Sequence, residues 1–162
     1  MFAPALATLL SLAALPEVDA TDRWTRTYPV TGRPAIELTS EDAEVRVETW
    51  NRPQVEVRVR TVGWPIGPEG VTVTERHQGD RIEVRAELPH LPWTRDLREH
   101  WFMIEVHTPP GADLIVQGGD GGAQVDGLAG SVRVRTGDGA IEVQRLDGDI
   151  ELASRDGAIR AT

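Results

Sequence analysis

The sequence contains no cysteine and no lysine, so all of its 17 basic residues are arginines. Without cysteine the chain forms no disulfide, carries no lipobox thiol for lipidation and offers no thiolate to a metal. The formal net charge is −9. That acidity argues against DNA, RNA and anionic lipid surfaces as partners, because phosphate binding needs a basic face. Aromatic residues make up only 5% of the chain.

An apolar run of the signal-peptide type lies at residues 6–15 and ends at Pro16. The run is shorter than the about 20 apolar residues of a membrane span, and Val18-Asp19-Ala20 has the pattern that signal peptidase accepts. We therefore predict that residues 1–20 are a signal peptide and that the chain is exported to the periplasm, the cell surface or the medium, with no integral membrane span after cleavage. No basic residue precedes the run, so an uncleaved anchor and a misplaced start codon stay open.

Short alternations of apolar and polar residues fill the chain from Trp24 onward. A period of two residues is typical of strands with one buried face, and no window has the 3.6-residue period of an amphipathic helix. We therefore predict an all-β domain with an N-terminal strand region at 21–108 and a repeat region at 109–162. The clearest predicted strands lie at residues 43–49, 54–62, 70–76, 80–88 and 100–108.

Residues 118–162 divide into five stretches of nine residues, each with glycine in the fourth place and usually aliphatic residues in the sixth and eighth. Because side chains alternate along a strand, we predict that places six and eight point into a core and that places five, seven and nine face solvent. A fainter recurrence at 18 residues indicates two strands per turn of a coil, or per hairpin. A fixed period is typical of a β-solenoid or β-helix-like stack. An antiparallel meander and a sandwich stay open as alternatives.

Aspartate and glycine stand together at most corners between these predicted strands. Glycine accepts positive φ without steric cost, and aspartate caps nearby backbone amides. We therefore predict structural turns at Asp120, Gly121, Gly130, Asp138, Gly139, Asp147, Gly148, Asp156 and Gly157.

A nine-residue repeat with glycine and aspartate first suggests a calcium-binding site. A calcium-binding β-roll needs aspartate in the sixth place, where this sequence has alanine, valine and isoleucine. One aspartate per corner is also sparse for an ion that needs six to eight converging oxygens. We predict no metal site and no cofactor.

Catalytic motifs are equally lacking. The four histidines share no metal-ligand spacing, and Ser131 and Ser154 lack the context of a nucleophile elbow. Asp138 and Asp156, about one coil apart, are the pair that a solenoid glycosidase or lyase would use, but turn chemistry explains both. We predict no catalytic residue and no enzymatic activity.

Two longer connections carry tryptophans. Trp64 lies in the glycine- and proline-rich segment 63–70, and Trp93 lies in the segment 89–99. An exposed indole stacks on the apolar face of a pyranose, so a carbohydrate-binding module that uses Trp64 and Trp93 is one interpretation. The other is that these rings cap the open end of the β core.

The last repeat ends at Thr162 with nothing after it to cover its strand. An uncovered strand edge invites pairing with another strand. We therefore expect either that the natural chain continues with further repeats or that the edge associates with a second copy.

Three segments, IEVHTPPGADLIV (104–116), GDGAIEVQRLDGDIELASRDGAI (137–159) and AIELTSEDAEVRVETWNRPQVEVRVR (35–60), resemble the bacterial putative-adhesin family, a domain of unknown function. The likeness covers about residues 24–162. The resemblance implies an exported or membrane-attached protein with a β-solenoid or β-helix-like fold and no established enzymatic activity. The chain departs from the family in the weak N-terminal part of its signal region, which has no basic residue, and in stopping where relatives commonly carry further repeats. The function that we predict is a non-catalytic structural or interaction module at the cell envelope, with an unidentified protein or glycan as partner.

Overall fold

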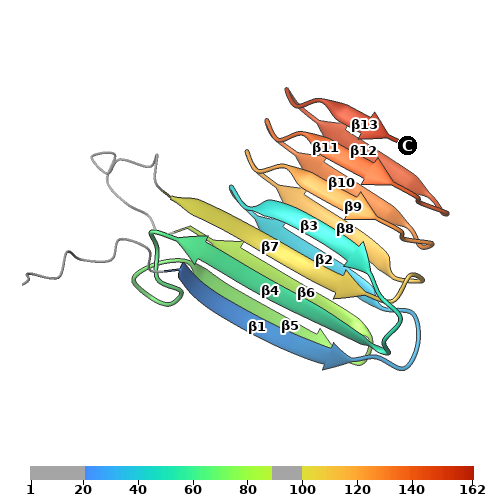
Figure 1. Ribbon diagram of the computed structural model, residues 1–162, viewed down its shortest axis with the longest axis horizontal. Coiled ribbons are helices and arrows are strands. Elements are labelled where there is room, and N and C mark those ends of the chain that lie inside the picture. Colours follow the sequence, from blue (N-terminus) through green and yellow to red (C-terminus); the bar gives the residue numbers. More distant parts are fainter. Residues whose placement is uncertain (1–20, 89–99) are drawn as a thin grey trace, which may run out of the picture.

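The computed structural model describes residues 21–88 and 100–162, and the regular elements in these ranges are thirteen β-strands (Figure 1). The strands form two stacked sheets. Sheet A has the order β1-β4-β7-β3-β9-β11-β13, and sheet B has the order β12-β10-β8-β2-β6-β5. No helix long and apolar enough to cross a membrane occurs in the described part of the chain. The all-β class is therefore confirmed.

The N-terminal region contributes seven strands, which include the five predicted above. They are β1 (Thr21–Pro29), β2 (Ala35–Ser40), β3 (Glu44–Thr49), β4 (Gln54–Val62), β5 (Thr72–Gln78), β6 (Arg81–Glu87) and β7 (Trp101–Thr108). Antiparallel pairing joins β1 to β4, β4 to β7 and β5 to β6. The remaining pairs are parallel, for example β2 with β6 and β3 with β7. Both sheets are therefore mixed.

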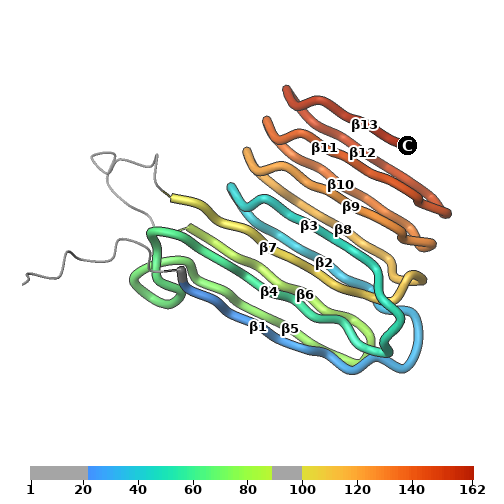
Figure 2. Tube along the Cα trace, viewed as in Figure 1, coloured from blue at the N-terminus to red at the C-terminus, as the bar shows by residue number. Residues whose placement is uncertain are grey.

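The repeat region adds six strands, and the chain crosses to the other sheet between each of them and the next (Figure 2). They are β8 (Asp113–Gly118), β9 (Ala123–Asp126), β10 (Val132–Thr136), β11 (Ile141–Gln144), β12 (Ile150–Ser154) and β13 (Ile159–Ala161). Within each sheet these strands are parallel, and a residue pairs with the one 18 positions further on, as Arg133 does with Glu151. The recurrence at 18 residues therefore marks two strands per turn, one in each sheet. The two stacked layers also fit the sandwich alternative.

We call two consecutive strands joined across the sheets a rung, so that β8–β9, β10–β11 and β12–β13 are three successive rungs. The strands β2 and β3 form a further rung directly beneath β8–β9, with Ile36 paired to Leu114 and Val45 paired to Ala123. On its other side this rung contacts β6 and β7. The chain therefore stacks β2–β3 out of sequence order, between strands that follow it.

The core lies between the sheets and consists of the inward-pointing apolar side chains. The residues in places six and eight of the lower repeat rungs are at most 2% exposed, as predicted: Leu114, Val116, Ala123, Val125, Val132, Val134, Ile141 and Val143. The last rung is the exception, because no strand of the described chain stacks on it. There Ile150 is 45% exposed and Ile159 is 47% exposed.

The glycines in the fourth place are required for close approach and not for positive φ, which corrects the expectation above. None of these five is among the positive-φ glycines of the described residues. Instead, a Cβ on Gly139 would lie 2.0 Å from the carbonyl oxygen of Gly121, and one on Gly121 would lie 2.0 Å from that of Ala43. The corners thus stack without room for a methyl group. The lowest corner of each column has alanine in this place, with Ala43 beneath Gly121 and Ala112 beneath Gly130.

The corner aspartates also differ from the expectation. No hydrogen bond among the described residues ends on the carboxylates of Asp120, Asp138 or Asp156. Hydroxyl groups at the ends of the strands make the local contacts instead: Ser154 Oγ accepts from the Gly157 amide at 2.9 Å, and Thr136 donates to the Gly139 carbonyl at 2.8 Å. The aspartates are therefore exposed corner residues and not caps.

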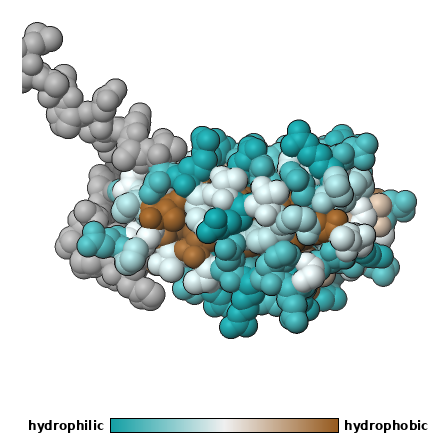
Figure 3. All heavy atoms as spheres, turned by 90° about the horizontal axis from the view of Figure 1, so that it is seen from below, coloured by the Kyte–Doolittle hydropathy of each residue, from teal (hydrophilic) through white to brown (hydrophobic). Residues whose placement is uncertain are grey.

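The opposite end of the stack is closed by the edge strands β1 and β5. Between them Glu75 accepts a short hydrogen bond from the Tyr28 hydroxyl and pairs with Arg26 at 3.2 Å. Trp24 and Val73 pack against the core from the same strands. Seen from this end, hydrophilic side chains surround small apolar areas (Figure 3). Polar groups thus cover the core here.

Candidate functional site

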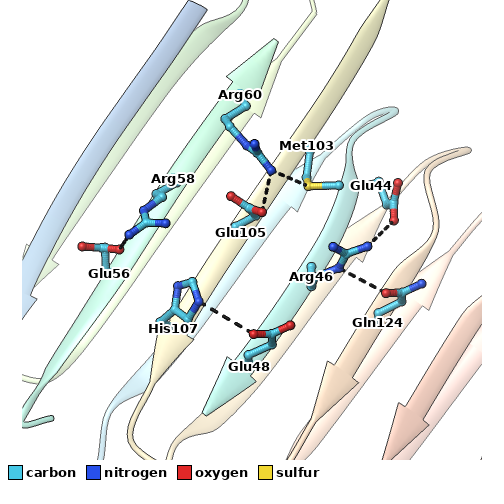
Figure 4. A network of polar contacts seen from close by, with 10 residues as sticks. All are labelled: Glu44, Arg46, Glu48, Glu56, Arg58, Arg60, Met103, Glu105, His107 and Gln124. Atoms are coloured by element: carbon cyan, nitrogen blue, oxygen red, sulfur yellow. Dashed lines mark hydrogen bonds and ion pairs between the residues drawn. The ribbon is translucent and has the colours of Figure 1, made fainter. Parts of the chain in front are cut away.

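The outer face of sheet A is a continuous surface of ion-paired side chains (Figure 4). They project from the solvent side of β4, β7, β3 and β9, because residues that alternate with the core valines must point outward. Arg60 pairs with Glu105 at 2.7 Å, and its guanidinium lies 3.7 Å from Met103 Sδ. Arg46 donates to Gln124 Oε1 at 3.2 Å. These contacts join strands that are distant in sequence.

Aromatic rings flank this face at both ends. The Trp50 ring stacks on His107 with centroids 5.2 Å apart, and the Arg52 guanidinium lies 4.7 Å from the centre of the same indole. The indole N–H of Trp50 donates to the Gln54 carbonyl at 2.8 Å. Trp101 is 37% exposed.

The outer face of sheet B carries a second set of ion pairs. Arg81 bridges Glu83 at 2.8 Å and Glu37 at 3.3 Å. Nearer the last rung, Glu151 pairs with Arg133 at 2.7 Å and Arg135 at 2.5 Å. Hydrogen bonds from these two arginines hold the pKa of Glu151 below its ordinary value.

A shallow groove of about 360 Å³ crosses this face between β2, β5 and β6. Apart from Val84, its lining residues are threonines, glutamates and arginines: Glu37, Thr39, Thr74, Glu75, Arg76, Glu83 and Arg85. Ligand pockets for small molecules are mostly apolar and enclosed, which this groove is not. Its open, mixed-charge surface suits contact with a polar macromolecule.

Trp64 does not offer the exposed ring that the sugar-platform interpretation requires. It is 8% exposed and belongs to the core cluster, with its ring 4.6 Å from that of His100. The Thr61 hydroxyl donates to the Trp64 carbonyl at 2.6 Å and holds the loop in place. This position agrees with the core-cap interpretation. Trp93 lies outside the described residues.

The described histidines and carboxylates do not converge on a common centre. His77 contacts the Gly79 carbonyl and the Tyr28 ring, His100 lies on Trp64, and His107 lies on Trp50. Across residues 21–88 and 100–162 no three histidine or carboxylate side chains are grouped so as to hold a metal ion. The corner residues Asp138 and Asp156 belong to corners that stack on each other, as predicted.

The sequence matches no family model and no curated protein. Solved structures are similar in fold. A putative cell adhesion protein from Clostridium sporogenes superposes with a TM-score of 0.56 over 86% of this chain and 97% of its own, at 8% identity. Putative adhesins from Parabacteroides merdae (TM-score 0.45, 9% identity, 86% of this chain and 56% of theirs) and Bacteroides fragilis (0.30, 11%, 86% and 97%) are more distant. The first similarity extends over nearly the whole described chain, and it agrees with the resemblance seen in the sequence.

Proposed function

We propose that this protein is a non-catalytic interaction module of the bacterial envelope, which is exported and presents the polar faces of its sheets to a protein or glycan partner. In this proposal the stacked rungs are a flattened β-solenoid that serves as a scaffold. The observation that carries the proposal is the pair of ion-paired outer faces over one continuous apolar core. The fold shared with a protein described as a putative cell adhesion protein supports it.

The outer faces suit recognition more than stability. Exposed ion pairs contribute only about 0–1 kcal/mol each to folding. They do hold long side chains in fixed positions, which reduces the entropy that a partner must remove on binding. The groove on sheet B, of about 360 Å³, is larger than the polar groove of about 110 Å³ on sheet A, so we place the partner contact there.

The test compares the two faces. The purified chain serves as bait against envelope fractions and against an array of envelope glycans. The double variant Arg76→Ala/Glu83→Ala changes the groove on sheet B, and Arg46→Ala/Glu142→Ala is the matched control on sheet A. We expect one specific partner that binds the wild type and the control alike and the groove variant at least about tenfold more weakly, the size of effect that loss of an interface contact has.

Failure to capture any specific partner, or equal binding by all three proteins, contradicts the proposal. The absence of catalysis has its own test. If a glycan-cleaving activity is found and it disappears in Asp138→Asn/Asp156→Asn, the protein is an enzyme and the proposal is wrong.

Carbohydrate binding remains a second candidate because Trp101 is exposed beside Arg60, whose guanidinium lies 5.7 Å from the ring centre. An indole with a flanking arginine suits an acidic sugar. Titration with uronic-acid-containing glycans, followed by tryptophan fluorescence, should then show a change that Trp101→Ala abolishes. An unchanged spectrum removes this candidate.

A further inference from the structure

Two rows of side chains form the groove on the outer face of sheet B, and both rows cross β5, β6 and β2 in register. Ile82 and Val84, which alternate with the groove residues of β6, are buried in the core, so the groove residues point to solvent. The first row consists of Arg76, Glu83 and Glu37, and the second consists of Thr74, Arg85 and Thr39. The groove is therefore an ordered array of charged and hydroxyl side chains.

The charges of this array balance one another. The three lining glutamates pair with Arg81 and Arg26, and one of the two lining arginines pairs with Glu87. Counted with these partners, the groove holds four carboxylates and four guanidinium groups and has no formal net charge. The whole chain, in contrast, has a formal net charge of −9. A strongly charged partner would therefore gain little attraction at the groove itself.

These ion pairs leave hydrogen-bonding capacity unused. Glu83 accepts from Arg81 through one carboxylate oxygen at 2.8 Å, and Glu37 accepts through one at 3.3 Å, whereas an ionised carboxylate has about four acceptor positions. No hydrogen bond or ion pair within the described residues engages the guanidinium of Arg76, which offers several N–H donors. The groove therefore presents unused donors and unused acceptors side by side.

A protein partner does not match these features. Protein interfaces are anchored by aromatic and apolar side chains that pack into a dry centre. The lining residues of the groove include no aromatic side chain, and their one aliphatic member, Val84, is 2% exposed. A polyanion or a polycation would need an excess of the opposite charge. The matching partner is uncharged and rich in hydroxyl groups, because a hydroxyl both donates and accepts hydrogen bonds.

We propose that the groove of sheet B binds a neutral glycan, whose hydroxyl groups bridge the arginine donors and the glutamate acceptors. Arg76 donates to hydroxyl oxygens of the glycan, and Glu37 and Glu83 accept from its hydroxyl groups. Because the groove is open, it takes an internal segment of a longer sugar chain. This inference rests on the proposed function, which places the partner contact in this groove, and it names the chemical class of the partner.

The chemistry of the groove also sets the character of the binding. Without an aromatic ring that stacks on the sugar, the affinity depends on hydrogen bonds that replace those to water, so binding should be weak. Salt screens the attraction between groups of opposite net charge. Since neither side of this contact carries a net charge, the dissociation constant should hardly depend on ionic strength. The complex of an acidic glycan or of a basic protein would instead weaken as salt is added.

Calorimetric titration of the purified chain tests the inference. The probes are oligosaccharides of a neutral glucan, a galactan and a mannan, with oligogalacturonate as the acidic counterpart. We expect at least one neutral glycan to bind, with a dissociation constant that changes less than about twofold between roughly 0.05 and 0.5 M salt. Arg76→Ala and Glu83→Ala should each weaken this binding at least about tenfold, because each removes hydrogen bonds made by a charged group. Arg133→Ala, on the same face but outside the groove, is the matched control and should bind like the wild type. Circular dichroism checks that all three variants remain folded.

Three results would overturn the inference and leave the proposed function standing. One is that no neutral glycan binds while the groove captures a protein or binds oligogalacturonate. Another is binding that falls steeply as salt is added. The third is neutral-glycan binding that survives Arg76→Ala and Glu83→Ala but is lost in Trp101→Ala, which would place the sugar on sheet A. If no partner of any class binds, the inference and the proposed function are both wrong.

Discussion

The two ends of the stack that the structure describes differ in the side chains that cover the apolar core. At each end, the outermost pair of described strands lies over the apolar core. At the β1–β5 end, Glu75 with Arg26 and Tyr28 closes the gap with polar groups. At the β12–β13 end, the repeat simply presents its next pair of isoleucines, which are nearly half exposed.

This difference shows that the burial of a rung's apolar side chains depends on the neighbouring rung and not only on the rung's own sequence. Ile141 and Ile159 occupy the same place in the repeat and are register partners in sheet A, yet one is 1% exposed and the other 47%. In stacked repeats much of the stability comes from the interfaces between units. Matched substitutions in an inner rung and in the last rung therefore measure the value of a neighbour directly.

The largest effect should come from truncating an inner aliphatic residue. Ile141→Ala removes a fully buried side chain and leaves a cavity, so we expect a loss of about 2–5 kcal/mol in the free energy of unfolding. Ile159→Ala is the matched variant at the open end, where the same truncation should cost about 1 kcal/mol or less because water already reaches the side chain. Denaturant titration of both variants measures the two losses. Equal losses in the free energy of unfolding would mean that water is excluded from Ile159 as it is from Ile141, so that the last rung is covered.

A smaller contrast should appear at the stacked corners. A methyl group on Gly139 would lie 2.0 Å from the Gly121 carbonyl oxygen, and relief requires two rungs to lift together. We expect Gly139→Ala to cost about 1–3 kcal/mol, as other cases of overpacking do. Gly157→Ala meets the Gly139 carbonyl oxygen at 2.1 Å, but only the terminal corner has to move. We therefore expect Gly157→Ala to reduce the free energy of unfolding by clearly less than Gly139→Ala does. Thermal denaturation of the two variants measures the difference.

The polar closure of the other end can be tested through Tyr28, whose side chain is 5% exposed. Tyr28→Phe removes the hydroxyl that donates to Glu75, and we expect a loss of about 1–2 kcal/mol, since the acceptor is charged. Burial raises the pKa of Tyr28 above its ordinary value of 10.0, and the hydrogen bond to Glu75 raises it further.

The pH dependence of that variant follows from the sign of the shift. A raised folded-state pKa gives stability that is fully present below the unfolded pKa and is lost as pH rises above it. The difference between wild type and Tyr28→Phe should therefore be constant at neutral pH and shrink above about pH 10. A difference that persists unchanged in alkali would contradict the role of the neutral hydroxyl.

The nine-residue period of the sequence predicted much of the fold of the repeat region. Aliphatic residues in places six and eight predicted the buried faces of β8 to β11. The recurrence at 18 residues predicted two strands per turn or per hairpin, and in the structure these two strands lie in different sheets. The β2–β3 rung escaped notice because its corner has Ala43 where later corners have glycine. That rung keeps the same spacing, with Ile36 and Val45 nine residues apart, so the signal was present in the sequence.

The side-chain contacts on the outer faces of the sheets could be predicted less well from the sequence. Alternation showed that these positions face solvent, but contacts such as Arg46 with Gln124 depend on which strands are neighbours. Because β3 lies between β7 and β9, that order does not follow the chain. For Trp64, the glycines and prolines around it indicated a loop and left the direction of its ring open between a sugar platform and a core cap, and the structure has the ring buried in the core.

The smallest effect that we predict concerns Asp113, at a corner between the inner rungs. Partial burial raises the pKa of this carboxyl, but hydrogen bonds from Arg33 and from the Ser131 amide, at 2.8 Å, outweigh burial and hold the pKa below its ordinary value. A lowered pKa gives stability that is present above the unfolded pKa near 4 and is lost as pH falls through the folded pKa. The side chain is 38% exposed, so solvent screening keeps the contribution below about 1 kcal/mol. Asp113→Asn should therefore differ from wild type in the free energy of unfolding at pH 6, and the difference should diminish steadily as the pH approaches 2. At the other end of the stack, Glu151→Gln should leave the free energy of unfolding nearly unchanged at every pH, because the Glu151 side chain is 47% exposed and solvent screens its ion pairs. An equal acid dependence of both variants would show that the last rung is as firmly held as the inner ones, and the contrast between the two ends would disappear.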